Sequence, residues 1–140
     1  MDIYEATQAL LKEAAPIGVN VSAYVLTYDA ILDKFDLPDF PAVTYNYALI
    51  DPIVDHTGEC NLFRVNLDVE VWGDLKQIAD NAKEVSEAIN AQRIQVENVE
   101  FTLVCTEARD IAELGLDFKR RYMRFAGLVS IGEEAHEDSL

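Results

Sequence analysis

Apolar and polar side chains alternate most regularly from Phe63 to Gly73 (FRVNLDVEVWG). Every second residue up to Val71 is apolar, which is the period of a β-strand with one buried face. Directly afterwards the period becomes 3.6 over residues 74–90 and predicts a helix, with Asp74 and Gln77 in a capping-box pattern at its start. The expected apolar stripe of this helix is Leu75, Ile78, Ala82, Val85 and Ile89.

The remaining pattern predicts a second helix and four further strands. Residues 2–16 have helical spacing, with Asp2 as N-cap and Pro16 and Gly18 ending the helix. The strands are expected at 19–28, 43–49, 99–106 and 123–131, and a helical turn is possible at Asp29–Phe35. Loops are expected around Pro38 and Pro41, over 51–61 and over 109–117. The inward residues of the last two strands are Val99, Phe101, Leu103 and Cys105, then Met123, Phe125, Val129 and Ile131.

This order of elements indicates one α+β domain. Strands outnumber the connections that parallel crossovers could serve, so we expect a mostly antiparallel sheet of four to five strands, with helices packed on one face. The domain is expected to span residues 1–132. Residues 133–140 are acidic with almost no apolar content and are predicted to form a flexible tail.

The net charge and composition of the chain argue against some classes of partner. A formal net charge of -15 over 140 residues argues against a surface that wraps nucleic acid. No apolar run approaches the length of a membrane span, and the acidic N-terminus resembles no secretion signal. Cys60 and Cys105 are expected to be reduced thiols.

A search for catalytic chemistry finds no signature. The glycines form no phosphate-binding loop, no serine lies in a G-x-S-x-G elbow, and the histidines are His56 and His136. Asp51, Asp55, His56 and Glu59 could together ligate a divalent ion; their spacing matches no metal loop, and a solvated acidic loop is the preferred interpretation. We therefore expect no enzyme activity, no cofactor and no metal site.

The segment FKRRYMRF concentrates basic residues in this acidic chain. One interpretation is a solvated strand face that carboxylates of the same subunit neutralise. A second is contact with acidic residues of an identical neighbour, and a third is phosphate binding, which the negative surroundings disfavour. Trp72 is expected to pack in the core or to anchor an interface, with packing favoured. The candidate interface residues are Arg64, Asp68, Glu70, Trp72, Lys119, Arg120, Arg121 and Arg124.

The order of segments resembles that of the tail-terminator (tail-completion) proteins of long-tailed bacteriophages and prophages. The resemblance covers residues 1 to about 132. It rests on the N-terminal helix, the proline-containing entry LPDFPAVTY, the strand FRVNLDVEVWG, the helix DLKQIADNAKEVSEAIN and the late strand RRYMRFAGLVSI.

The resemblance implies a structural role in the neck of the virion, after assembly in the host bacterial cytoplasm. Such proteins form a ring, commonly a hexamer, that ends polymerisation of the tail tube and provides a surface for the head-tail connector. The implied partners are copies of the chain, the tail tube protein and the connector, with DNA only passing through the lumen and no membrane. Alternatives are another neck or head-completion protein and an acidic adaptor that binds a protein partner.

Overall fold

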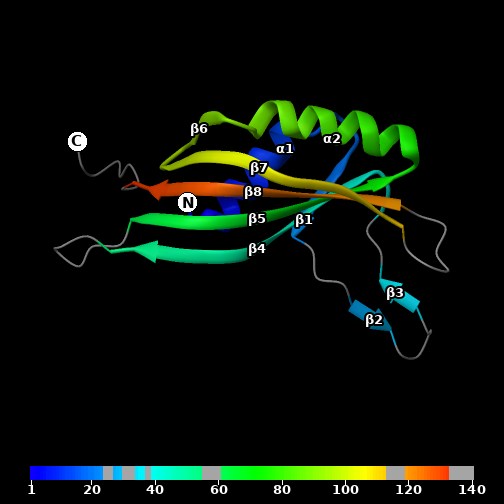
Figure 1. Ribbon diagram of the computed structural model, residues 1–140, viewed down its shortest axis with the longest axis horizontal. Coiled ribbons are helices and arrows are strands. Elements are labelled where there is room, and N and C mark those ends of the chain that lie inside the picture. The colour runs from blue at the N-terminus through cyan, green and yellow to red at the C-terminus, as the bar shows by residue number, and fades with distance from the viewer. Residues whose placement is uncertain (24–26, 30–33, 37–38, 55–60, 113–118, 133–140) are drawn as a thin grey trace.

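The computed structural model describes residues 1–23, 27–29, 34–36, 39–54, 61–112 and 119–132 (Figure 1). Their fold is α+β, as the sequence predicts. No helix among these residues combines the length and the apolar character that a bilayer span requires. The elements, in chain order, are α1 (Ile3–Ala14), β1 (Asn20–Ala23), β2 (Thr27–Asp29), β3 (Lys34–Asp36), β4 (Ala42–Ile53), β5 (Leu62–Gly73), α2 (Leu75–Ile89), β6 (Gln92–Val96), β7 (Val99–Ala112) and β8 (Lys119–Ile131).

The main sheet has six strands in the order β1-β4-β5-β8-β7-β6, and β2 and β3 form a separate antiparallel pair. Strand β1 runs parallel to β4, and the other neighbours in the main sheet are antiparallel. The sheet is therefore larger than predicted and mixed in direction. A parallel neighbour requires a long connection, and the chain between β1 and β4 supplies one.

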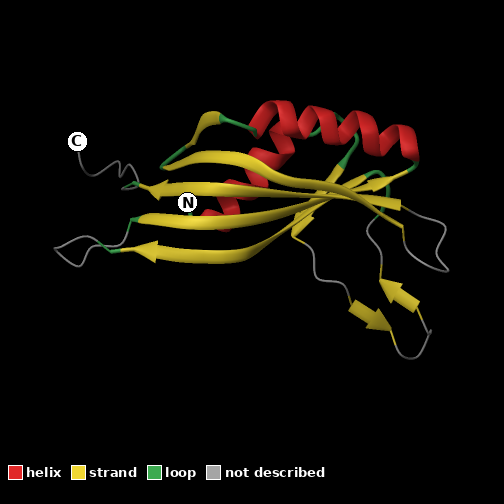
Figure 2. Cartoon of the chain, viewed as in Figure 1, coloured by secondary structure: helices red, strands yellow, loops and turns green. Residues whose placement is uncertain are grey.

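Both helices lie on one face of the sheet (Figure 2). The Asp2 carboxylate caps α1 by accepting the Glu5 N–H at 2.8 Å. At the start of α2, Asp74 and Gln77 form the reciprocal capping box that the sequence predicts. Capping satisfies backbone donors that have no partner within the helix.

The core lies between these helices and one face of the sheet. The inward residues of β5 and β8 alternate as predicted; those of β5 are Val65, Leu67, Val69 and Val71, all without exposed surface. The stripe predicted for α2 is correct from Ile78 onward but wrong at Leu75, which is largely exposed. Leu75 occupies the first position of α2, beyond the end of the covered face.

Several predicted boundaries differ from the structure. Strand β4 continues through Pro52 and β7 continues through Arg109 to Ala112, so both predicted loops begin too early. The helical turn suggested at Asp29–Phe35 is wrong at both ends, which lie in β2 and β3. Residues 30–33, and the predicted tail at 133–140, lie outside the described residues.

The direction of the backbone N–H groups in β8 follows from two hydrogen bonds. The N–H of Ile131 bonds toward the start of β5, and that of Gly132 bonds toward the start of β7. The N–H groups of even-numbered residues in β8 therefore point toward β7, because successive N–H groups of a strand point to opposite neighbours. Since Arg109 pairs with Tyr122, the N–H of Ala108 points away from β8, toward the outer edge of β7.

The same alternation explains why a proline is compatible with β4. The N–H groups of odd-numbered residues in β8 point toward β5, so those of even-numbered residues in β5, such as Arg64, point toward β4. Asp51 pairs with Arg64, and its own N–H therefore points toward β5. The nitrogen of Pro52 consequently faces the outer edge, where no ladder bond is lost.

Candidate functional site

The face of the sheet opposite the helices, here called the open face, contains most of the residues that the sequence singles out. Alternation along β5 directs Asp68, Glu70 and Trp72 to this face. In the β5–β8 register they lie opposite Arg124, Tyr122 and Arg120.

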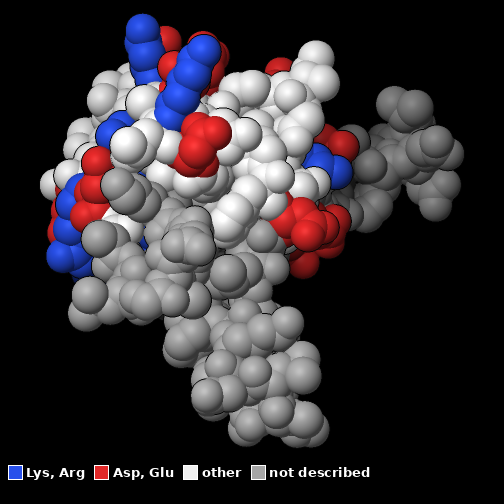
Figure 3. Space-filling model, turned by 90° about the vertical axis from the view of Figure 1, so that its right-hand side faces the viewer, with Lys and Arg blue, Asp and Glu red and all other residues white. Residues whose placement is uncertain are grey.

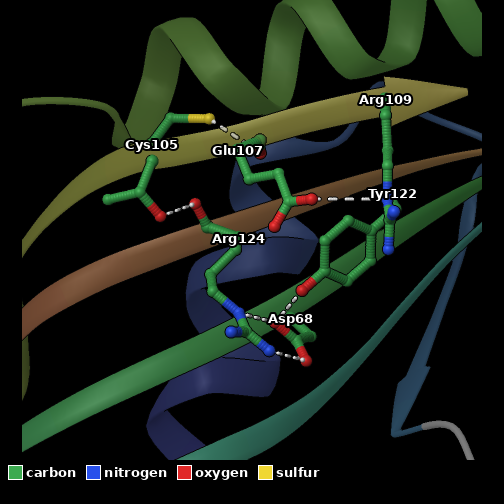
Figure 4. Close-up of polar contacts among 7 residues, drawn as sticks. Asp68, Cys105, Glu107, Arg109, Tyr122 and Arg124 are labelled. Carbon is green, nitrogen blue, oxygen red and sulfur yellow. Dashed lines mark hydrogen bonds and ion pairs between the residues drawn. The ribbon is translucent and has the colours of Figure 1, made fainter.

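Asp68 is the centre of the first cluster on the open face (Figure 4). The Arg124 guanidinium donates to both Asp68 oxygens, from Nε at 2.7 Å and from an Nη atom at 3.1 Å. The Tyr122 hydroxyl donates to the same carboxylate at 2.7 Å. A carboxylate that accepts three hydrogen bonds, two of them in fork geometry, fixes the lateral position of its neighbouring strand.

The electrostatics of this cluster keep Tyr122 in its neutral, donating form. Burial and the hydrogen bond to the Asp68 carboxylate raise the pKa of Tyr122 from 10.0 to about 12. The hydrogen bonds and negative charge of Asp68 also raise the pKa of Arg124. Tyr122 is therefore a hydrogen-bond donor at neutral pH and cannot serve there as a base.

Strand β7 adds two charged residues that the sequence analysis left in a predicted strand end and loop. The register of β7 shifts between Cys105 and Glu107, and this irregularity brings Glu107 and Arg109 onto the open face. The Arg109 guanidinium lies 5.2 Å from the centre of the Tyr122 ring and 3.4 Å from a Glu107 carboxylate oxygen. Residues 107–112 read EARDIA, which has no regular alternation of apolar and polar residues that would have indicated this part of the strand.

A second cluster surrounds Trp72, which has no exposed surface. Its indole N–H donates to Thr44 Oγ1 at 2.9 Å, and its ring stacks on Phe40 with 5.9 Å between centroids. Arg120 covers the indole at 5.1 Å and bonds to Glu70 at 2.8 Å. Trp72 therefore packs within the chain, as the favoured interpretation predicts, and offers no surface to a partner.

The other candidate residues are not part of either cluster. Arg64 pairs with Asp51 at 2.6 Å further along the open face. Arg121 points to the opposite side of β8 and pairs with Asp110 at 2.7 Å. Lys119 begins β8, and its side chain is outside the described part of the structure.

The carboxylate partners of these arginines belong to the same chain. The sequence offered three interpretations of the basic segment, and these contacts agree with the one in which the subunit neutralises its own strand face. Pairing of Arg120 and Arg124 with an identical neighbour is not required for their charge balance, because Glu70 and Asp68 already provide it.

The open face is electrically neutral over the described residues, although the molecule is strongly acidic. Figure 3 shows the side of the molecule at the right of Figure 1, where most basic side chains also lie beside acidic ones. By strand register, the arginines of the open face are Arg64, Arg93, Arg109, Arg120 and Arg124, and its carboxylates are Asp51, Asp68, Glu70, Glu100 and Glu107.

Apolar side chains occupy the other end of the open face. Leu49 and Ile53 of β4, Val104 of β7 and Leu128 of β8 are exposed, with Val104 at 49%. The open face therefore combines paired arginines with exposed aliphatic groups, while the rings of Tyr122 and Trp72 are buried.

The acidic loop proposed as a divalent-ion site cannot be assessed as a unit. Asp51 is engaged by Arg64, while Asp55, His56 and Glu59 lie outside the described residues, as does Cys60. Within the described ranges, no group of three acidic, histidine or cysteine side chains is suited to hold a metal ion.

Comparison with known proteins does not identify the chain. Its sequence matches no protein-family model and no curated protein.

Proposed function

We propose that the chain is a structural protein of a bacteriophage or prophage tail, which forms a ring on the end of the tail tube. The ring ends polymerisation of the tube and presents a surface to the head-tail connector. The proposal is supported by the resemblance in segment order and by the arrangement of strand edges in the sheet. It assigns no catalytic residue, cofactor or metal.

The supporting observation is a pair of strand edges that no described strand covers. Strand β1 pairs with β4 only as far as Tyr45, so no strand of the described ranges pairs with the outer side of residues 46–53. Strand β6 pairs with β7 only as far as Leu103, and the bridge and side-chain contact of Asn90 extend the cover to Cys105. The outer side of residues 106–112 is uncovered in the same way.

These two edges are suited to heterologous contact between copies. They lie on opposite sides of the sheet and at opposite ends of its strands (Figure 1). Strands β4 and β7 run antiparallel, because β5 and β8 lie between them in an all-antiparallel order. The β7 edge of one copy can therefore add to the β4 edge of the next in the favoured antiparallel sense, and repetition with a rotation closes a ring. Pro52 supplies no N–H, so the usable part of the β4 edge ends at Asp51.

The edge contact is tested by removing one outward N–H group. Ala108→Pro eliminates a donor that points away from β8 and leaves the β7–β8 ladder intact, whereas Ala108→Ser retains the donor and is the matched control. We expect wild-type protein and Ala108→Ser to form a concentration-dependent oligomer in sedimentation velocity, and Ala108→Pro to remain monomeric with unchanged circular dichroism. Assembly of the proline variant to wild-type size would exclude this edge.

The role in the tail is tested by electron microscopy of phage lysates made without the protein. Overlong tails without heads are expected, because nothing would stop tube growth. Headless tails of normal length would instead indicate another neck component. Normal virions would contradict the proposed function altogether.

A further inference from the structure

A hollow separates the end of α1 from the middle of α2, on the side of the molecule opposite the open face. Its volume is about 640 Å³, which lies within the usual range for ligand sites. Its lining combines polar residues of both helices with apolar residues at the end of α1. The residues that matter for the inference are Glu13, Ile17, Asp80, Asn81, Lys83 and Glu84.

The hollow has a negative electrostatic character. Three of its residues, Glu13, Asp80 and Glu84, are carboxylates, and the one lysine on its rim is drawn toward Glu87, which does not line it. Helix α1 also ends here at Ala14. The last carbonyl groups of a helix lack intrahelical donors and contribute further partial negative charge.

The chemistry of the lining favours an organic cation over a metal ion. Among the described residues, no three acidic side chains are close enough together to hold a metal. A planar guanidinium carries five N–H donors and can reach carboxylates that are spread apart. The fully exposed Ile17 at the rim provides apolar surface against which an aliphatic stem can pack.

Asn81 provides an independent indication of a ligand. This residue is only 7% exposed, and its side-chain amide has no hydrogen-bond partner within the described part of the chain. Its amide atoms are accessible to water, since they are not among the buried side-chain atoms that lack a hydrogen-bond partner in the described chain. Its position in the lining of the hollow makes its oxygen available to a donor that enters from outside.

We propose that this hollow binds an arginine side chain of a different protein. The arginine donates to the Asn81 amide oxygen and to the surrounding carboxylates, while its stem contacts Ile17. A second copy of the chain is a poor source of this arginine, because its own arginines are engaged in ion pairs. Those pairs join Arg64 to Asp51, Arg93 to Glu100, Arg109 to Glu107, Arg120 to Glu70, Arg121 to Asp110 and Arg124 to Asp68.

The test is a titration of the full chain with N-acetyl-arginine methylamide, followed by the NMR signals of the Asn81 side-chain amide. The control ligand is N-acetyl-citrulline methylamide, which has nearly the same shape without the charge. We expect saturable shifts with the arginine compound and roughly tenfold weaker binding of citrulline, as for loss of a charge-assisted hydrogen bond. Equal binding of both compounds, or no saturable shift, would overturn the proposal.

Variants locate the binding within the hollow. Asp80→Asn combined with Glu84→Gln is expected to abolish the shifts, whereas Glu87→Gln on the same helix retains them. Asn81→Leu is expected to weaken binding, because it removes the amide oxygen that accepts from the arginine. Wild-type affinity in Asn81→Leu would refute the role of the amide.

Two further readouts complete the test. Shifts of the Asn81 signal that grow with protein concentration alone would show that another copy fills the hollow, and would overturn the assignment to a different protein. The titration involves neither a ring nor a tail tube, so its outcome is separate from that of the proposed function.

Discussion

The phenol of Tyr122 illustrates how a single residue couples the open face to pH. Its hydroxyl bonds to Asp68 and its ring lies beneath the Arg109 guanidinium. Ionisation would place a second negative charge against the Asp68 carboxylate. The folded state consequently favours the neutral phenol, as the raised pKa shows.

This coupling predicts a loss of stability at alkaline pH. The pKa of Tyr122 is about 12 in the folded protein and 10.0 as the ordinary value, so the contribution of the neutral phenol is complete below about pH 10 and is lost as the pH rises toward 12. Burial raises the pKa of Tyr45 and Tyr47 as well, so wild type must be compared with Tyr122→Phe. The difference between their urea midpoints should shrink over this range; a constant difference would show that Tyr122 is not responsible.

Gly127 is a second residue whose identity the structure explains. It lies in β8 between Val65 and Leu103, and a Cβ atom at this position would overlap the carbonyl oxygen of Thr102. Backbone of a central strand cannot move aside as a flexible side chain can. Only glycine fits here.

Gly127→Ala is therefore expected to lower the free energy of unfolding by about 1–3 kcal/mol, the usual cost of overpacking. The matched control is Gly132→Ala, since a Cβ there would approach no closer than 3.4 Å to Asn98 O; its effect should stay within about 0.5 kcal/mol. Urea denaturation of the two variants measures both values. Similar values for the two would contradict the proposed overlap.

At the scale of elements, the β5–β8 pair is held by side chains as well as by its backbone ladder. The Asp68–Arg124 and Glu70–Arg120 pairs connect these strands on the open face, and the latter pair is mostly buried. Charged partners removed from water are costly to separate, because the remaining charge is left without compensation. Reversing a charge in either pair should therefore lower the stability of the monomer, whether or not the chain self-associates.

Arg124→Glu is expected to lower the melting temperature of the monomer, because it replaces two charge-assisted hydrogen bonds by repulsion from Asp68. Combination with Asp68→Arg should recover part of this loss, because the pair is restored in the opposite orientation. Arg93→Glu is the control, since Arg93 is 78% exposed in its pair with Glu100 and its reversal should change the melting temperature much less. Thermal unfolding measures each step; an unaltered melting temperature in Arg124→Glu would contradict the role of the pair.

The sequence predicted those elements whose pattern depends on neighbours along the chain. The alternation of β5 and the capping box of α2 were both correct, since local spacing and local hydrogen bonds determine them. Strand β6 was missed because QRIQV has few apolar residues and pairs only at an edge. The parallel direction of β1 depends on a distant partner, which periodicity cannot reveal.

The candidate site was predictable in part for the same reason. The predicted inward positions Met123 and Phe125 leave Arg120, Tyr122 and Arg124 for the other face of β8, and the structure agrees. The strand that lies beside them in the register was not predictable, so Arg109 and Glu107 were not associated with this cluster. The hollow between α1 and α2 depends on helix packing and had no signal in the sequence.

At the scale of the whole molecule, charge is distributed unevenly. The open face is neutral in its described residues, so the excess of acidic groups that gives the net charge of -15 lies elsewhere. Two copies repel each other through this excess, and dissolved salt screens the repulsion over about 10 Å at 0.1 M ionic strength.

Self-association is therefore expected to strengthen as salt is raised from low to moderate concentration, and sedimentation velocity measures this directly. Contacts made by ion pairs between copies would respond in the opposite way, because screening weakens attraction between opposite charges. Weaker association at moderate salt would thus favour intersubunit ion pairs over strand-edge addition.

The neutrality of the open face also affects how a partner can approach. An acidic body that drifts toward this protein meets a repulsive potential from most directions and almost none in front of the β5–β8 pair. The charge distribution would thereby favour encounters in which an acidic partner faces the open face, which is electrostatic steering. An extra carboxylate in front of those strands is expected to slow the approach of an acidic partner at low salt.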